Sequence, residues 1–167
     1  MHKINFSNKI NLKKEVNRQA LYNGFISSSN FPRLIDTVLK INSDLSTSIE
    51  FSKDEVDNYI INLKIDADVT LMCQRCCEDY VYHIRIEQLY MGKRNNYNFI
   101  DPNYEEITPD ENGDIDILSL IEDELLLALP IIPMHLQNDC SIKDDTQSFG
   151  QIEEKENPFA ILNKLKK

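Results

Sequence analysis

The chain of 167 residues is long enough for one domain with a hydrophobic core, and its 41% hydrophobic and 28% charged residues exclude wholesale disorder. No run of apolar residues reaches the length of a membrane-spanning helix, and the first ten residues lack an apolar signal core, so we expect a cytoplasmic protein. The net charge of −10 argues against a conventional RNA-binding domain that neutralises many phosphates.

The charge is unevenly distributed along the chain. Residues 1–40 carry seven Lys and Arg against two acids, whereas residues 101–156 carry sixteen acids against two Lys. An acidic region of this size is repelled by nucleic acid and attracted to basic proteins, of which ribosomal proteins are an abundant class. The alternative interpretation is that this charge serves solubility alone.

The N-terminal region is predicted to be helical and basic. Apolar residues at helical spacing from residue 9 onward predict an amphipathic helix that ends near Gly24. Its outer face would carry Lys13, Lys14 and Arg18, which we expect to face RNA. Pro32 would lie in the first turn of a second, short helix.

The middle of the chain shows the clearest pattern. Apolar and polar residues alternate over three long runs between residues 39 and 86, which predicts antiparallel strands with one face in water. The stretch "SKDEVDN" would turn the first hairpin, and "CQRCCED", at residues 73–79, the second. The cysteines are therefore expected at a corner between two strands.

The acidic region begins with a predicted loop over residues 92–113. A core helix is predicted at 115–129, with Asp114 or Asp116 as its N-cap and Pro130 ending it.

A mobile acidic segment follows, and "NPFAILNKLKK" predicts a C-terminal helix with Asn157 as its cap.

These elements predict an α+β fold: a twisted antiparallel sheet of long strands, barrel-like or covered by the core helix and by terminal helices. We expect a single domain over residues 1–167. It would comprise a basic helical region at residues 1–37, the sheet at 38–91, the acidic loop and helix at 92–130, and the mobile segment with the C-terminal helix at 131–167.

Two pairs of potential metal ligands occur in the chain. Cys73 and Cys76 have the C-x-x-C spacing, and His135 and Cys140 follow an extended segment that could return to the corner. Together they offer the four soft ligands that zinc prefers. The alternative is that the cysteines are reduced and merely shape the corner. Cys77 is a spare thiol, and the motif does not open a helix as a thioredoxin-like redox site requires.

The acidic side chains favour docking over catalysis. Glu122, Asp123 and Glu124 point in diverging directions around a helix, so they cannot converge on one substrate atom, and we expect them to receive basic side chains of a partner. Glu105 and Glu106 in the loop would join this surface. A loosely held divalent ion is the alternative for the loop acids, which include Asp101, Glu105, Glu106 and Asp110. His83 is interpreted as a surface histidine, and no nucleophile elbow, phosphate loop or triad is present, so we predict no enzyme.

Three stretches together resemble the YceD family of large ribosomal RNA subunit accumulation proteins. They are "VTLMCQRCCEDY", "NGDIDILSLIEDELLLALPIIPMH" with the "NDC" that follows it, and "NPFAILNKLKK". The resemblance implies a cytoplasmic bacterial protein needed for synthesis, processing or stability of the large-subunit 23S ribosomal RNA, without enzymatic activity. This chain departs from the family pattern at Cys77, where relatives usually carry a small residue such as Gly, or Leu.

The resulting hypothesis is a noncatalytic ribosome-biogenesis factor whose acidic surface binds a basic large-subunit ribosomal protein or a pre-ribosomal particle. One alternative is an RNA-processing enzyme that uses a metal held by the loop carboxylates, with Asp101 essential. A third hypothesis is a zinc- or redox-sensing regulator of ribosome production.

Overall fold

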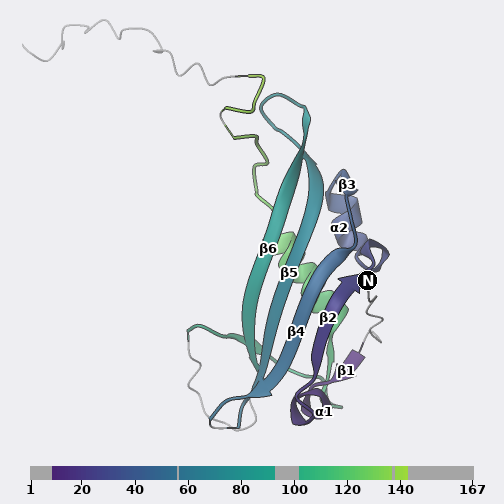
Figure 1. Cartoon of the computed structure of the whole chain (residues 1–167), viewed down its shortest axis with the longest axis vertical. Helices are drawn as coiled ribbons and strands as arrows, with labels where there is room; N and C mark the ends of the chain where they lie inside the picture. The colour runs from purple at the N-terminus through teal and green to yellow at the C-terminus, as the bar shows by residue number, and fades with distance from the viewer. Residues whose placement is uncertain (1–8, 56, 93–101, 137, 143–167) are drawn as a thin grey trace, which may run out of the picture.

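The computed structural model describes residues 9–55, 57–92, 102–136 and 138–142, which form an elongated, curved molecule (Figure 1). The elements in chain order are β1 (Lys9–Asn11), α1 (Leu12–Asn17), β2 (Leu21–Ile26), a 3-10 turn (Ser28–Asn30), α2 (Pro32–Thr37), β3 (Lys40–Ile41), β4 (Leu45–Lys53), β5 (Tyr59–Met72), β6 (Asp79–Gly92), β7 (Glu105–Ile107), β8 (Asp114–Asp116) and α3 (Ile117–Leu127). The predicted α+β class is confirmed.

The long strands follow the predicted alternation. Along β5 the odd-numbered residues from Ile61 to Leu71 are buried, and their neighbours Lys64 and Asp66 are exposed. The antiparallel pairing with β6 keeps buried residues on the same face of both strands, because buried Ile84 lies opposite buried Ala67. The sheet therefore has one apolar face that packs in the core and one polar face in water.

The main sheet is open, so the barrel-like alternative is wrong. Its six strands run in the order β2-β4-β5-β6-β7, with β3 beside β5. All pairings are antiparallel except that of β7, which runs parallel to β6. A second sheet contains only β1 and β8. Parallel β7 also corrects the prediction of a structureless loop over 92–113, of which residues 93–101 lie outside the described residues.

The predicted core helix is present as α3. The Asp116 side chain accepts a hydrogen bond from the backbone N–H of Ser119, which confirms Asp116 as the N-cap. Ile117, Ile121 and Leu125 are fully buried and join the hydrophobic core on the apolar face of the sheet. The helix ends at Leu127, shortly before Pro130, which was predicted to end it.

The long N-terminal helix is a wrong prediction. The Asn11 side chain caps α1, which has only six residues and ends before Gln19, whose φ of 49° is left-handed. The chain then forms β2, in which Gly24 pairs with Thr47 instead of ending a helix. Pairing with β4 satisfies the backbone of this segment, which outweighs its weak helical pattern. The C-terminal helix predicted from Asn157 lies outside the described residues.

Candidate functional site

The hairpin corner between β5 and β6 positions the first pair of cysteines. The backbone N–H of Cys73 bonds the carbonyl of Glu78 at 2.9 Å, and the N–H of Cys77 bonds the carbonyl of Cys73 at 2.9 Å. This turn buries the Cys73 side chain and leaves Cys76 half-buried. Cys77 takes a left-handed φ of 61° and is exposed, so it lies apart from the other thiols.

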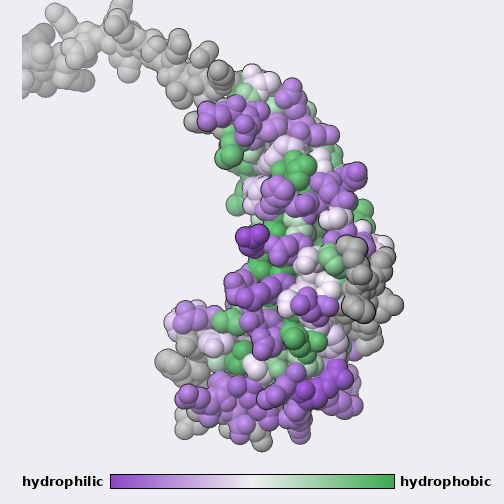
Figure 2. Space-filling view, viewed as in Figure 1, coloured by the Kyte–Doolittle hydropathy of each residue, from purple (hydrophilic) through white to green (hydrophobic). Residues whose placement is uncertain are grey.

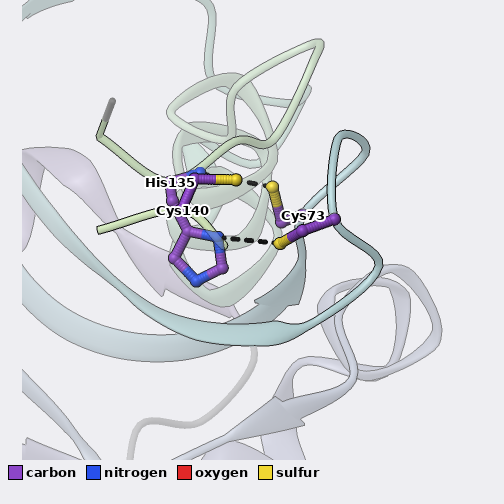
Figure 3. A group of neighbouring side chains, drawn as sticks. Cys73, His135 and Cys140 are labelled. Carbon is purple, nitrogen blue, oxygen red and sulfur yellow. Dashed lines mark hydrogen bonds between the residues drawn. The ribbon is translucent and has the colours of Figure 1, made fainter. Parts of the chain in front are cut away.

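The segment after α3 brings the second pair of ligands to this corner. Pro130 and Pro133 keep the chain from continuing as a helix, and the backbone N–H of Gln74 bonds the carbonyl of Pro133 at 2.8 Å. Figure 3 shows the side chains of His135 and Cys140 pointing toward the corner that carries Cys73. The His135 ring also stacks against Tyr80 in a tilted arrangement with 4.9 Å between ring centroids.

The four predicted metal ligands therefore form one cluster. The thiols of Cys73, Cys76 and Cys140 and a ring nitrogen of His135 all lie within 4.8 Å of one another. Cys76 Sγ is 3.3 Å from His135 Nδ1, and Cys73 and Cys140 are buried. In the described portion of the chain this is the one group of three or more Cys, His or acidic residues with such spacing.

Hydrogen bonds at the corner favour the thiolate form of Cys73. Burial alone would raise the pKa of Cys73, but the backbone N–H groups of Cys76, His135 and Arg75 outweigh it and lower the pKa to about 5. The Arg75 guanidinium donates to Cys140 Sγ at 3.0 Å. A thiolate beside further soft donors is the chemistry of a metal site or of a reactive cysteine.

The acids of α3 serve three different contacts. Glu122 is 5% exposed, and its carboxylate accepts from the backbone N–H groups of Arg33 and Leu34 at 2.7 and 3.2 Å and from Arg33 Nε at 2.8 Å. It thus caps α2, whose own N-cap residue, Phe31, offers no side-chain bond. Sequence reasoning missed this contact and expected Asn30 or Ser29 to cap the helix, because the acceptor that caps it lies 89 positions away along the chain.

The other two acids are more accessible. Asp123 is exposed and bonds Arg33 Nη1 at 2.7 Å. Glu124 accepts a short hydrogen bond from the Tyr90 hydroxyl. Burial, reinforced by Glu124, raises the pKa of Tyr90 above its ordinary value, so this hydroxyl stays protonated and keeps donating. Of the three, Asp123 presents the most open carboxylate to a partner.

The loop acids are separated by the fold. Glu105 and Glu106 are exposed on β7. Asp110 accepts from Lys9 Nζ at 2.9 Å and from two backbone N–H groups of its own turn, and the Lys9 contact above all lowers its pKa. Asp101 lies outside the described residues, so the four-acid ion site cannot be assembled from those that the structure describes.

The basic residues of α1 lie at the end of the sheet opposite the cysteine corner. Leu12 of α1 packs against Gly92, which pairs with Tyr59 at the start of β5, and Figure 1 shows α1 and the β5–β6 corner at opposite ends of the molecule. Lys13 and Lys14 are exposed. Arg18 instead bonds Glu15 at 2.9 Å and the Tyr22 hydroxyl.

His83 lies on the polar face, where it contacts Asp68 at 2.6 Å. The His83 side chain is largely exposed and that of Asp68 is about half-exposed, as expected for a surface histidine. Figure 2 shows that polar and charged residues dominate this view of the molecule, with hydrophobic patches between them. None of the helices among the described residues combines the length and hydrophobicity needed to cross a membrane.

The cysteine corner, the segment that carries His135 and Cys140, and the acids of α3 all lie within a stretch of the sequence that matches a defined class of proteins. Residues 61–166 match the family described as "Large ribosomal RNA subunit accumulation protein YceD". The chain is 33% identical over 172 residues to the protein of that name from Haemophilus influenzae, and the match covers 99% of each chain. No solved structure matches significantly.

The chain therefore belongs to the YceD family, which confirms the resemblance found in the sequence. The family name describes a role in the accumulation of the large ribosomal RNA and names no enzyme class.

Proposed function

We propose that this protein is a noncatalytic, cytoplasmic ribosome-biogenesis factor required for accumulation of the large-subunit 23S ribosomal RNA. The full-length match to the Haemophilus influenzae protein of that name carries this proposal. The 99% coverage of both chains means that the relative has no large additional domain in which its role could reside.

The proposed mode of action is binding of a basic ribosomal protein or a pre-ribosomal particle. The acidic surface consists of Glu105 and Glu106 on β7 and Asp123 on α3, all of them exposed. Exposed carboxylates on a packed scaffold form charge-assisted hydrogen bonds with Arg and Lys at a low ordering cost. Glu124, half-buried, borders this surface. Glu122 contributes indirectly, because it fixes α2 against α3.

The opposite charge is displayed on α1. Lys13 and Lys14 are exposed there, and we assign them to phosphate contacts with the RNA of a bound particle. Arg18, engaged with Glu15 and Tyr22, would reach phosphate only by exchanging these partners. With only two exposed lysines on α1 and a net charge of −10 for the chain, direct RNA affinity should be weak and strongly salt-dependent.

The test combines two measurements. Depletion in the host cell should lower the ratio of large-subunit to small-subunit ribosomal RNA, and an unchanged ratio would contradict the accumulation role. Reversal of Glu105 and Glu106 to Lys should then reduce co-sedimentation of the protein with large-subunit precursors about tenfold, because favourable charge contacts become repulsive.

The matched control for this reversal changes the same number of charges elsewhere. Glu50 lies on the polar face of β4 and Glu55 in the turn that follows β4, and both are exposed. Glu50→Lys with Glu55→Lys should retain co-sedimentation. Equal loss in both double variants would indicate a net-charge effect and would contradict a defined docking surface.

A metal-dependent RNA-processing enzyme remains the rival hypothesis. It requires that the purified protein cleave precursor RNA with Mg²⁺ and lose this activity on Asp101→Ala. We favour the binding role, because two of the carboxylates that such a metal site would use lie in separate contacts. Asp110 bonds Lys9, and Glu105 is part of β7, where it pairs with Tyr90 of β6.

A further inference from the structure

We propose that Cys73, Cys76, His135 and Cys140 bind one structural Zn²⁺ ion. This inference is independent of the ribosomal role, since it depends only on the corner and on the segment after α3. Zinc bound by thiolates and imidazole is four-coordinate and tetrahedral, with bonds of about 2.3 Å to sulfur and about 2.0 Å to nitrogen. Such bonds hold the ligand atoms roughly 3.5 to 3.8 Å apart, and the four ligand atoms here already lie within 4.8 Å of one another.

The donor set selects the metal. Three thiols and one imidazole are soft or borderline ligands, which disfavours Mg²⁺ and Ca²⁺. Four protein ligands fill the tetrahedron, so no position remains for a water or a substrate. The ion would therefore be structural and not catalytic.

The surroundings of the sulfur atoms fit a charged centre. Three thiolates outnumber the two charges of Zn²⁺, and the Arg75 guanidinium lies at hydrogen-bond distance from Cys140 Sγ. The backbone N–H of His135 points at Cys73 Sγ at 3.5 Å. Such outer contacts orient the ligands and offset the excess charge in metal sites.

The segment that carries His135 and Cys140 has little else to hold it in place. Between residues 131 and 142 the described side chains include one buried residue, Cys140, whereas the large hydrophobic side chains are exposed: Ile131, Ile132, Met134, Leu136 and Ile142. Burial of apolar surface, the usual force that fixes a chain segment, is thus small here. A metal ion would supply the missing link between this segment and the corner.

The experiment measures metal and thiols on the full-length protein, purified with reductant and without chelator. Elemental analysis should give about one zinc per chain. Co²⁺ exchanged into the site should show the visible bands of tetrahedral cobalt and a sulfur-to-cobalt charge-transfer band. Neither measurement requires a variant, so both remain decisive if a substitution prevents folding.

Variants then assign the ligands. Cys140→Ser and His135→Ala should lose most of the zinc, and the matched control Cys77→Ser should keep it, since Cys77 is exposed and outside the cluster. Arg75→Gln should retain zinc but lose it to a competing chelator at concentrations about tenfold lower.

Three results would overturn the proposal. They are zinc-free protein with four reactive thiols, protein that shows fewer than four thiols when denatured because disulfides have formed, and stoichiometric iron in place of zinc. Full zinc content in Cys140→Ser would overturn the ligand assignment in the same way.

Discussion

The two ends of the long sheet are held together by different forces. At the α1 end, Leu12, Val16 and Ile115 are buried in the common core, and the small β1–β8 sheet closes over it. At the corner end the chain returns through a segment with few buried side chains, whose contacts are hydrogen bonds and the Cys3His cluster. The comparison shows that hydrophobic packing dominates at one end of the molecule, whereas hydrogen bonds and a cluster of cysteine and histidine side chains join the segments at the other.

The largest expected effect comes from the packed end. Leu12 is 1% exposed and contacts Gly92 closely enough that a Cβ there would lie 2.7 Å from Leu12 Cδ2. Leu12→Ala should lower the free energy of unfolding by about 3 kcal/mol, because it removes buried methyl groups and leaves a cavity. Urea denaturation measures this, with the exposed neighbour Lys13→Ala as a control that should change stability by less than about 0.5 kcal/mol. Equal effects of the two substitutions would contradict the packing role of α1.

An intermediate effect is expected where α2 meets α3. Glu122→Ala removes a buried carboxylate and leaves two backbone N–H groups and Arg33 Nε without their acceptor, although Arg33 keeps its bond to Asp123. The free energy of unfolding should fall by about 2 kcal/mol, a value reduced by the 50% exposure of the Arg33 side chain.

Asp123→Ala is the matched control for this prediction, since Asp123 is exposed and contacts the same arginine. It should change stability by less than about 1 kcal/mol. Thermal and urea denaturation of the two variants side by side would separate the structural acid from the surface acid, and a larger loss for Asp123→Ala would contradict this assignment.

The smallest effect on global stability, and the most local one, is expected at the corner. Treatment with a strong zinc chelator should increase hydrogen exchange at the backbone N–H of Gln74, which bonds Pro133, and of the neighbouring Cys73. Amides of β4 should keep their protection. Uniform loss of protection throughout the sheet would show that the corner and the core unfold together and would contradict the contrast between the two ends.

Much of the middle of the fold could be predicted from the sequence. Apolar and polar residues alternate along β4, β5 and β6 because one face of the sheet is buried and the other is exposed. The position of the β5–β6 corner follows from the point at which this alternation is interrupted. Asp116 could be predicted as one of two possible N-caps of α3, because a cap bonds a backbone N–H only a few residues further along the chain. The ligand cluster was also predictable, since soft ligands are rare in this chain and two pairs were available.

The remaining features depend on contacts between distant segments of the chain. The Arg33–Glu122 bond joins residues 89 positions apart, and parallel β7 pairs with β6 beyond an intervening segment. The break of the predicted N-terminal helix into β1, α1 and β2 depends on partners supplied by β8 and β4. A local pattern contains no information on such partners, so propensity was overridden by pairing.

The shortness of β7 has a consequence for how chains behave at high concentration. Among the described residues β7 pairs only with Tyr90–Gly92, so most of the outer margin of β6 presents backbone donors and acceptors that another strand could use. Exposed polar and charged residues lie along this margin, namely His83, Arg85 and Glu87. Charged side chains on an edge strand oppose edge-to-edge pairing with the sheet of another molecule. Self-association through added strands is thus restrained by these charges, and neutralising them would remove a safeguard against aggregation.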